Sequence, residues 1–319
     1  MPVRLTASLL IAAMLSAVPA SAQSWPQRNV RFVLPLGPGA GADIGARLLA
    51  DRLAKAWGQA VVVENRPGGD GVVAITTVLN ANDDHIFLWG PSGAFVAHPY
   101  LHQKVPYDAS QIVPIARVTN TLVSVSVPTA SGIGTLAEFV ATAKKEPGKL
   151  NWAAVTGLND FQFQAFAKTA AIDIVRVPYR DGVQALNDLA EGRIHAYSSA
   201  YAISRPQVQA GKIKVIALTN TARADVLPGV PTAREAGHPA LEFDGLVGLY
   251  STPVVPAAIR DRISNDVMEA MKDPIVIDRL TATGQVVNPG RAKEFVASID
   301  HQRAGAAETA KVLGLKKAD

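Results

Sequence analysis

The sequence predicts an α/β protein with two lobes, each a mainly parallel sheet flanked by helices. Strand and helix patterns alternate in one series before about residue 118 and in a second from about residue 135. Apolar segments near 112–127 and 246–251 fit strands that cross between the series. A chain of 319 residues, 48% hydrophobic, is long enough to bury two cores. We therefore expect a discontinuous lobe 1 (23–122 and 246–319), a lobe 2 (123–245) and a ligand cleft between them.

The first strand–helix unit contains a loop of small residues. Residues 30–34 are apolar and mostly β-branched, which indicates a buried strand, and 44–57 carry apolar side chains at helical spacing. Residues 35–42 lie between them and include three glycines, so a ligand could approach the backbone closely. Asp43 fits an N-cap and Gly58 a helix stop. Free N–H groups and the helix dipole favour an anion at such a position.

Strand and helix patterns also alternate along the rest of the chain. We expect strands at 60–64, 86–89, 112–118, 122–127, 149–154, 174–177, 194–199, 214–219 and 246–251. Expected helices are 72–81, 93–100, 135–145, 160–171, 183–190, 202–210, 256–271, 274–283 and 291–313. Loops 35–42, 65–71 and 90–93 follow parallel strands, so they share the sheet edge where ligands usually bind.

A second unit repeats this logic at residues 149–171. A strand runs into a Thr-Gly turn, and Asn159 or Asp160 caps the helix that follows. If the lobes face each other, two helix N-termini point into one cleft and hold a carboxylate through backbone N–H groups. Phe161, Phe163 and Phe166 are expected in the core, with Phe161 the nearest of them to the loop.

The N-terminus has the pattern of an export signal. Arg4 precedes an apolar run at 5–18, and Ala20-Ser21-Ala22 is a cleavage site of the A-x-A type. We expect cleavage after Ala22 and a periplasmic location. The chain has no cysteine, which is compatible with export. Its net charge of +4 is spread along the chain without a dense basic run, which argues against a nucleic-acid partner.

Three other chemistries remain open at this point. Gly37-x-Gly39-x-x-Ala42, with Glu64 ending the next strand, is a loose dinucleotide pattern, so an NAD(P)-binding oxidoreductase is the alternative function. Gly90-Pro91-Ser92-Gly93-Ala94 is one residue away from a nucleophile elbow, which would make Ser92 a hydrolase nucleophile. His98 and His102 are four residues apart, but no third zinc ligand lies nearby in the sequence. We expect no catalytic residue, no cofactor and no metal.

The chain resembles the Bug, or TctC, family of periplasmic substrate-binding proteins of tripartite tricarboxylate transporters. The matching segments lie in order from the mature N-terminus to about residue 250. They are Trp25-Pro26, Val33-Leu34-Pro35 with Gly39 to Asp43, 46–50, 58–59, 61–68, 105–108, 147–150, 177–179, 211–212, 227–232 and 235–237. The resemblance implies a two-lobe, Venus-flytrap solute-binding protein, not an enzyme. Its expected partners are membrane transporter subunits, and we expect a monomer.

The resemblance also implies a ligand site. Family members grip a ligand carboxylate between the first glycine loop and the second-lobe loop, largely through main-chain groups and water. On this chain the site residues are Pro38, Gly39, Ala40, Gly41, Ala42, Asp43, Ser92, Val155, Thr156, Gly157, Asn159, Asp160, Phe161, Tyr179, Ser199 and Ala200.

Two departures from the family pattern concern the ligand. The first loop differs at Leu36, Gly37, Pro38 and Ala40, and the second loop lacks a histidine. Asp160 would disfavour a second ligand carboxylate unless a donor intervenes, and it would suit a hydroxyl, an amine or an amide.

Overall fold

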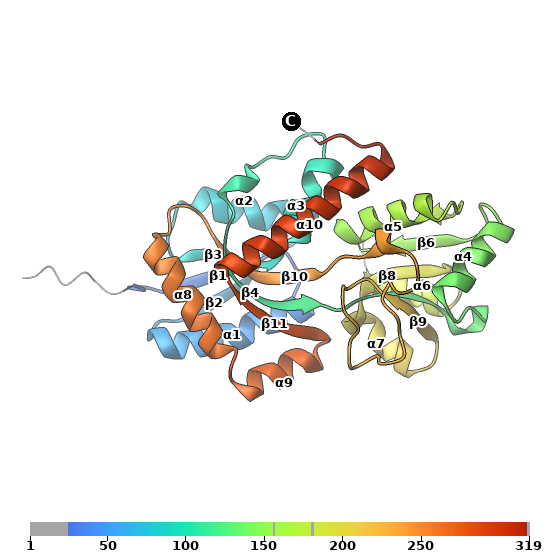
Figure 1. The fold of residues 1–319 in the computed structure, drawn as a ribbon. Helices are drawn as coiled ribbons and strands as arrows, with labels where there is room; N and C mark the ends of the chain where they lie inside the picture. The colour runs from blue at the N-terminus through green and yellow to red at the C-terminus, as the bar shows by residue number, and fades with distance from the viewer. Residues whose placement is uncertain (1–24, 156, 180–181, 318–319) are drawn as a thin grey trace, which may run out of the picture.

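A computed structural model describes residues 25–155, 157–179 and 182–317, and it confirms the two-lobe α/β architecture (Figure 1). Lobe 1 has a six-stranded sheet of order β11-β4-β10-β3-β1-β2. Its strands are β1 (Val30–Leu34), β2 (Val61–Asn65), β3 (Ile86–Pro91), β4 (Val113–Thr121), β10 (Gly245–Ser251) and β11 (Gln285–Arg291). Lobe 2 has a five-stranded sheet of order β7-β6-β8-β5-β9. Its strands are β5 (Val123–Pro128), β6 (Asn151–Ala154), β7 (Val175–Arg176), β8 (Ala196–Ala200) and β9 (Ile213–Leu218).

The sheets are mixed, so the prediction of mainly parallel sheets was wrong in this detail. β1 pairs in parallel with β2 and β3, and β6 with β7 and β8. β10 and β5, which lie next to the crossings between lobes, are antiparallel to both of their neighbours. Each of these strands enters its sheet at the edge where the parallel strands end, because Val247 near the start of β10 pairs with Pro91 and Val123 at the start of β5 pairs with Ala200. It therefore runs against the parallel strands.

Helices cover both faces of the lobe 1 sheet. The face built from Val247 and Leu249 packs on α1 (Gly41–Trp57), α8 (Ala257–Ala270) and α9 (Pro274–Ala282). The face built from Leu246 and Tyr250 packs on α2 (Val72–Ala81), α3 (Gly93–Leu101) and α10 (Ala292–Leu313). The two cores therefore lie on opposite sides of β10.

In lobe 2 one face of the sheet packs on α4 (Leu136–Lys145) and α5 (Leu158–Thr169). The other packs on α6 (Gly182–Ala190) and α7 (Tyr201–Gln209). Trp152 and Phe163 stack with ring centroids 4.4 Å apart and are almost fully buried. Phe161, Phe163 and Phe166 are all completely buried, as expected for core residues.

The lobes touch beyond the strands that join them. Helix α10 of lobe 1 reaches across to α5 of lobe 2 (Figure 1), where the Thr309 hydroxyl donates to the Gln162 side-chain oxygen at 2.8 Å. On another side of the molecule Arg205 of α7 donates to the Ala282 carbonyl at 2.9 Å. No helix within the described ranges is long and apolar enough to span a bilayer.

Candidate ligand-binding site

The first glycine loop joins β1 to α1 and ends at a helix N-terminus without a side-chain cap. Ala40 is the N-cap, with extended backbone, and α1 begins at Gly41. The expected N-cap Asp43 was therefore wrong, because this residue lies inside the first turn. Among the described residues nothing accepts the N–H groups of Gly41 and Ala42. Unpaired N–H groups at the positive end of a helix dipole are where an anion would bind, and the ligand role of this loop stays a prediction.

The Asp43 side chain stabilises this loop through hydrogen bonds. Its buried carboxylate accepts hydrogen bonds from the Gly39 N–H at 2.9 Å, from Arg47 at 3.0 Å and from Asn65 at 2.8 Å. Burial alone raises the pKa of Asp43, but these hydrogen bonds and the charge of Arg47 outweigh it and leave the pKa below its usual value. Asp43 thus fixes the loop, and its charge is compensated by Arg47.

Replacing Asp43 by asparagine should destabilise the protein at neutral pH by about 1–3 kcal/mol, because Arg47 loses its charged partner. The folded-state pKa lies below the unfolded one, so the carboxylate stabilises the fold above about pH 4 and this contribution is lost as pH falls further. The Asp43→Asn variant should therefore lose less stability than wild type between pH 7 and pH 3. Urea unfolding at both pH values measures this, with exposed Asp51→Asn as the control. Parallel pH curves for wild type and Asp43→Asn would contradict the assignment.

The second loop repeats the arrangement at α5. The N-cap is Gly157, with φ of 87° and ψ of −137°, and the helix begins at Leu158. The expected caps Asn159 and Asp160 were wrong, since both lie within the first turn. No described residue accepts the N–H groups of Leu158 and Asn159. Thr156 lies outside the described residues.

Asp160 is a buried first-turn acid like Asp43. Its carboxylate accepts from Arg176 Nε at 2.6 Å and from Gln164 Nε2 at 2.9 Å, and its side chain is 8% exposed. The negative charge is therefore compensated by Arg176 at the end of β7. The sequence could not show this contact, because the two residues lie on different elements.

The structure brings several predicted segments together. A Cβ on Gly93, the last residue of the third rim loop, would lie 3.3 Å from the Leu158 Cβ, so the two lobes meet there. A Cβ on Gly41 would lie 2.7 Å from Gln285 Nε2, and the Gln285 side-chain oxygen accepts from Thr119 at 2.9 Å. Sequence reasoning missed Gln285, since it belongs to a strand that was not expected.

Ser199 and Ala200 of β8 are predicted site residues, and Ser199 has a buried hydroxyl group without a hydrogen-bond partner among the described residues. Ser199 pairs with Ser124 across β5 and β8, and both hydroxyl oxygens are buried without a hydrogen-bond partner among the described residues. Ala200 is the N-cap of α7 and lies at the same rim. Val155 precedes the second loop, is 40% exposed and donates its N–H to the Ser198 carbonyl at 3.1 Å.

Three predicted side chains are already used within the protein. Ser92 is fully buried and its hydroxyl donates to the Gln302 side-chain oxygen at 2.5 Å. Phe161 is fully buried and stacks on Tyr100. The Tyr179 hydroxyl donates to Asp188 at 2.7 Å. Ser92 and Phe161 are fully buried, so a ligand contact from them requires backbone atoms or a rearrangement, whereas Tyr179 is partly exposed.

The geometry also bears on the alternative chemistries. The Glu64 carboxylate, the expected ribose acceptor, is held by Arg31 and Arg66, and these hydrogen bonds lower its pKa. Both ring nitrogens of His98 are engaged, Nδ1 with the Tyr107 hydroxyl at 2.6 Å and Nε2 with the Asp70 carbonyl at 3.1 Å. Neither group is free for the role that its motif would require.

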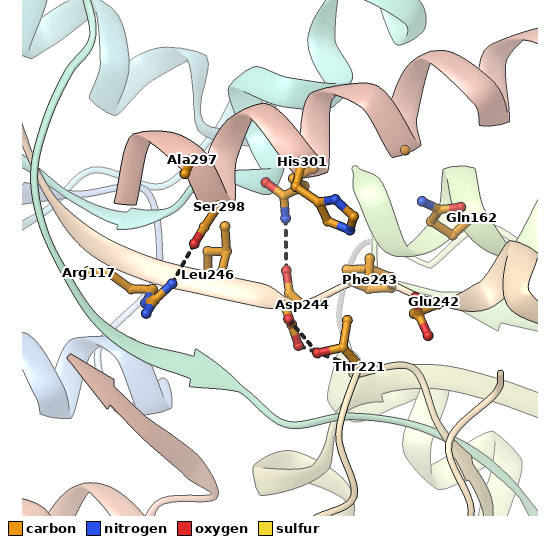
Figure 2. Close-up of a pocket in the computed structure, with 12 residues that line it drawn as sticks. Arg117, Gln162, Thr221, Glu242, Phe243, Asp244, Leu246, Ala297, Ser298 and His301 are labelled. Atoms are coloured by element: carbon orange, nitrogen blue, oxygen red, sulfur yellow. Dashed lines mark hydrogen bonds between the residues drawn. The ribbon is translucent and has the colours of Figure 1, made fainter. Parts of the chain in front are cut away.

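A separate cavity of about 410 Å³ lies between α10 and the crossing that leads into β10 (Figure 2). It is lined by Arg117, Gln162, Thr221, Glu242, Phe243, Asp244, Leu246, Ala297, Ser298, His301, Gln302 and Gly305. None of the predicted ligand residues lines it. Leu246 places it on the α10 face of β10, opposite the face that packs on α1. Gln302 connects this crossing to the rim, because its Nε2 donates to the Asp244 carbonyl while its oxygen accepts from Ser92.

Comparisons with known proteins identify the family of this chain. Residues 45–314 match the family described as Tripartite tricarboxylate transporter family receptor. Protein BugT of Bordetella pertussis is 28% identical, covering 91% of this chain and 91% of its own length. A structure from R. palustris with adipate is 26% identical, with a TM-score of 0.81, and covers 91% of this chain and 99% of that one. MatC from Rhodopseudomonas palustris with bound malate is 27% identical, with a TM-score of 0.76, covering 90% and 99%.

The family match extends over most of the chain, and members of this family are periplasmic solute-binding proteins and not enzymes. The chain therefore belongs to the TctC, or Bug, family of periplasmic solute-binding proteins.

Proposed function

We propose that this chain captures a small organic carboxylate and delivers it to the membrane subunits of a tripartite tricarboxylate transporter. The observation that carries the proposal is the pair of uncapped helix N-termini, at Gly41 and Leu158, each with N–H groups that no described residue accepts. Such groups bind a carboxylate well without a free cation. Two structural relatives, which hold adipate and malate, support the ligand class.

The two lobes would close on the carboxylate at the rim where Gly93 approaches Leu158. Asp43 and Asp160 lie in the first turns of the two helices, and each is compensated by an arginine. The local charge is therefore close to neutral, which permits an anion. We further propose that residues 1–22 are removed on export and that the mature protein acts in the periplasm as a monomer.

The direct test is thermal unfolding of residues 23–319 against a panel of carboxylates, after unfolding and refolding to strip any bound ligand. A ligand at 100 times its dissociation constant adds about 2.7 kcal/mol of stability, which raises the Tm by several degrees. We expect a shift with one class of acid and no chemical change to that acid. A shift with NAD and with no carboxylate would favour the dinucleotide alternative instead.

A further inference from the structure

Arg176 uses fewer of its guanidinium N–H donors within the protein than Arg47, the corresponding arginine of lobe 1. Arg47 donates through Nε and Nη2 to Asp43, and Nη2 also donates to Asn65 at 2.9 Å. Arg176 donates only through Nε, to Asp160. No described residue accepts from its two terminal nitrogens, and its side chain is 43% exposed. Lobe 2 therefore presents a guanidinium with unused donors.

The position of Arg176 follows from the fold. β7 is the edge strand of the lobe 2 sheet, and Arg176 is its last residue, opposite Trp152 of β6. The parallel strands β6 and β7 therefore end at the same rim, where β6 leads into Gly157 and α5. The contact with Asp160 holds the guanidinium beside the first turn of α5, the helix whose N-terminus is proposed to bind the proximal carboxylate.

We propose that Arg176 determines ligand specificity by binding the second, distal carboxylate of a dicarboxylate. This inference rests on the proposed function, in which the helix N-termini hold the proximal carboxylate. Asp160 alone would repel a second anion, but its charge is compensated by Arg176, and the terminal nitrogens of that arginine can form a bidentate pair with a carboxylate. Asp160 is thus a positioning residue that orients Arg176.

The test compares matched acids, adipate with hexanoate and succinate with butyrate, by titration calorimetry on the mature chain. The double variant Arg176→Gln/Asp160→Asn removes the guanidinium without leaving the Asp160 charge uncompensated. It should weaken dicarboxylate binding roughly ten- to hundredfold, because charge-assisted hydrogen bonds are lost, and leave monocarboxylate binding unchanged. Asp160→Asn should keep the preference for dicarboxylates, because the asparagine oxygen can still accept from Arg176 Nε and orient the guanidinium. The control Arg223→Gln removes an exposed arginine of the same lobe that pairs with Glu235, and it should change neither affinity.

The outcomes separate this inference from the function on which it rests. Equal losses for both acids in the double variant, or no loss, would overturn the specificity role and leave carboxylate binding intact. Wild-type binding of monocarboxylates alone would also overturn it. If the wild type binds no carboxylate of either kind, the proposed function fails as well. Circular dichroism and urea unfolding of the double variant Arg176→Gln/Asp160→Asn, which leaves no unpaired buried charge, check that a lost preference is not a folding defect.

Discussion

Gly157→Val is expected to weaken ligand binding more than a hundredfold while leaving both lobes folded. Gly157 has φ of 87° and ψ of −137°, a conformation that side chains with a Cβ avoid at a cost of about 1–3 kcal/mol. No heavy atom lies within 4 Å of a Cβ placed there, so the effect comes from the backbone and not from a clash. Relief of the strain turns the peptide that leads into α5, and the N–H groups of Leu158 and Asn159 then lose their direction. Calorimetric titration with the acid found for wild type measures the loss.

A matched control at a glycine outside the predicted site separates an effect on ligand binding from the general cost of backbone strain. Gly132 also has a positive φ, of 71°, with no heavy atom within 4 Å of its Cβ, but it follows a short turn before α4. Gly132→Val should lower stability and leave affinity unchanged. Gly39→Val, at a φ of 86° in the first glycine loop, should behave like Gly157→Val. Wild-type affinity in both loop variants would show that these loops do not hold the ligand.

The strand–turn–helix units could be predicted from sequence because their signals are local. Apolar runs such as 30–34 and helical spacing at 44–57 lie within one window, and the structure places β1 and α1 there. The helix stop at Gly58 is also confirmed, with φ of 67° and its N–H on the Ala54 carbonyl. The glycine loops followed from the same patterns, and this is why the predicted site centres on them.

Features that depend on distant residues were missed. β11 contains Asn288-Pro289-Gly290, which reads as a turn, and it becomes a strand only because it pairs with β4. The caps were misplaced for a related reason. Aspartate is a common N-cap residue, but the carboxylates of Asp43 and Asp160 accept hydrogen bonds from arginines. Arg47 lies on the same helix as Asp43, whereas Arg176 lies on strand β7. Ser92 donates to Gln302, 210 residues further along the chain, which no local pattern indicates.

Gly248→Val should prevent lobe 1 from folding stably. Gly248 lies in β10, between β3 and β4, where the register with β4 shifts next to it. A Cβ at this position would lie 2.3 Å from the Ala116 carbonyl oxygen and 2.5 Å from Phe295 Cε1. Overpacking of this kind costs about 1–3 kcal/mol when neighbours can move. Here one neighbour is ladder backbone and the other is a fully buried ring, so we expect a loss above about 3 kcal/mol, a large part of the total stability of a typical domain.

Urea unfolding and soluble yield of Gly248→Ala and Gly248→Val give the measurement. Gly305→Ala in α10 is the control, because no heavy atom lies within 4 Å of its Cβ and alanine in a helix gains about 0.5–1 kcal/mol over glycine. In the Gly248→Ala background, Phe295→Leu relieves the contact with the ring but not the contact with the Ala116 carbonyl. We therefore expect this second substitution to restore only part of the lost stability. Since Phe295 of α10 packs on this strand and α10 also reaches α5, a loosened β10 should weaken ligand binding in any folded fraction. A Gly248→Ala variant as stable as wild type would mean that α10 does not pack this closely on β10.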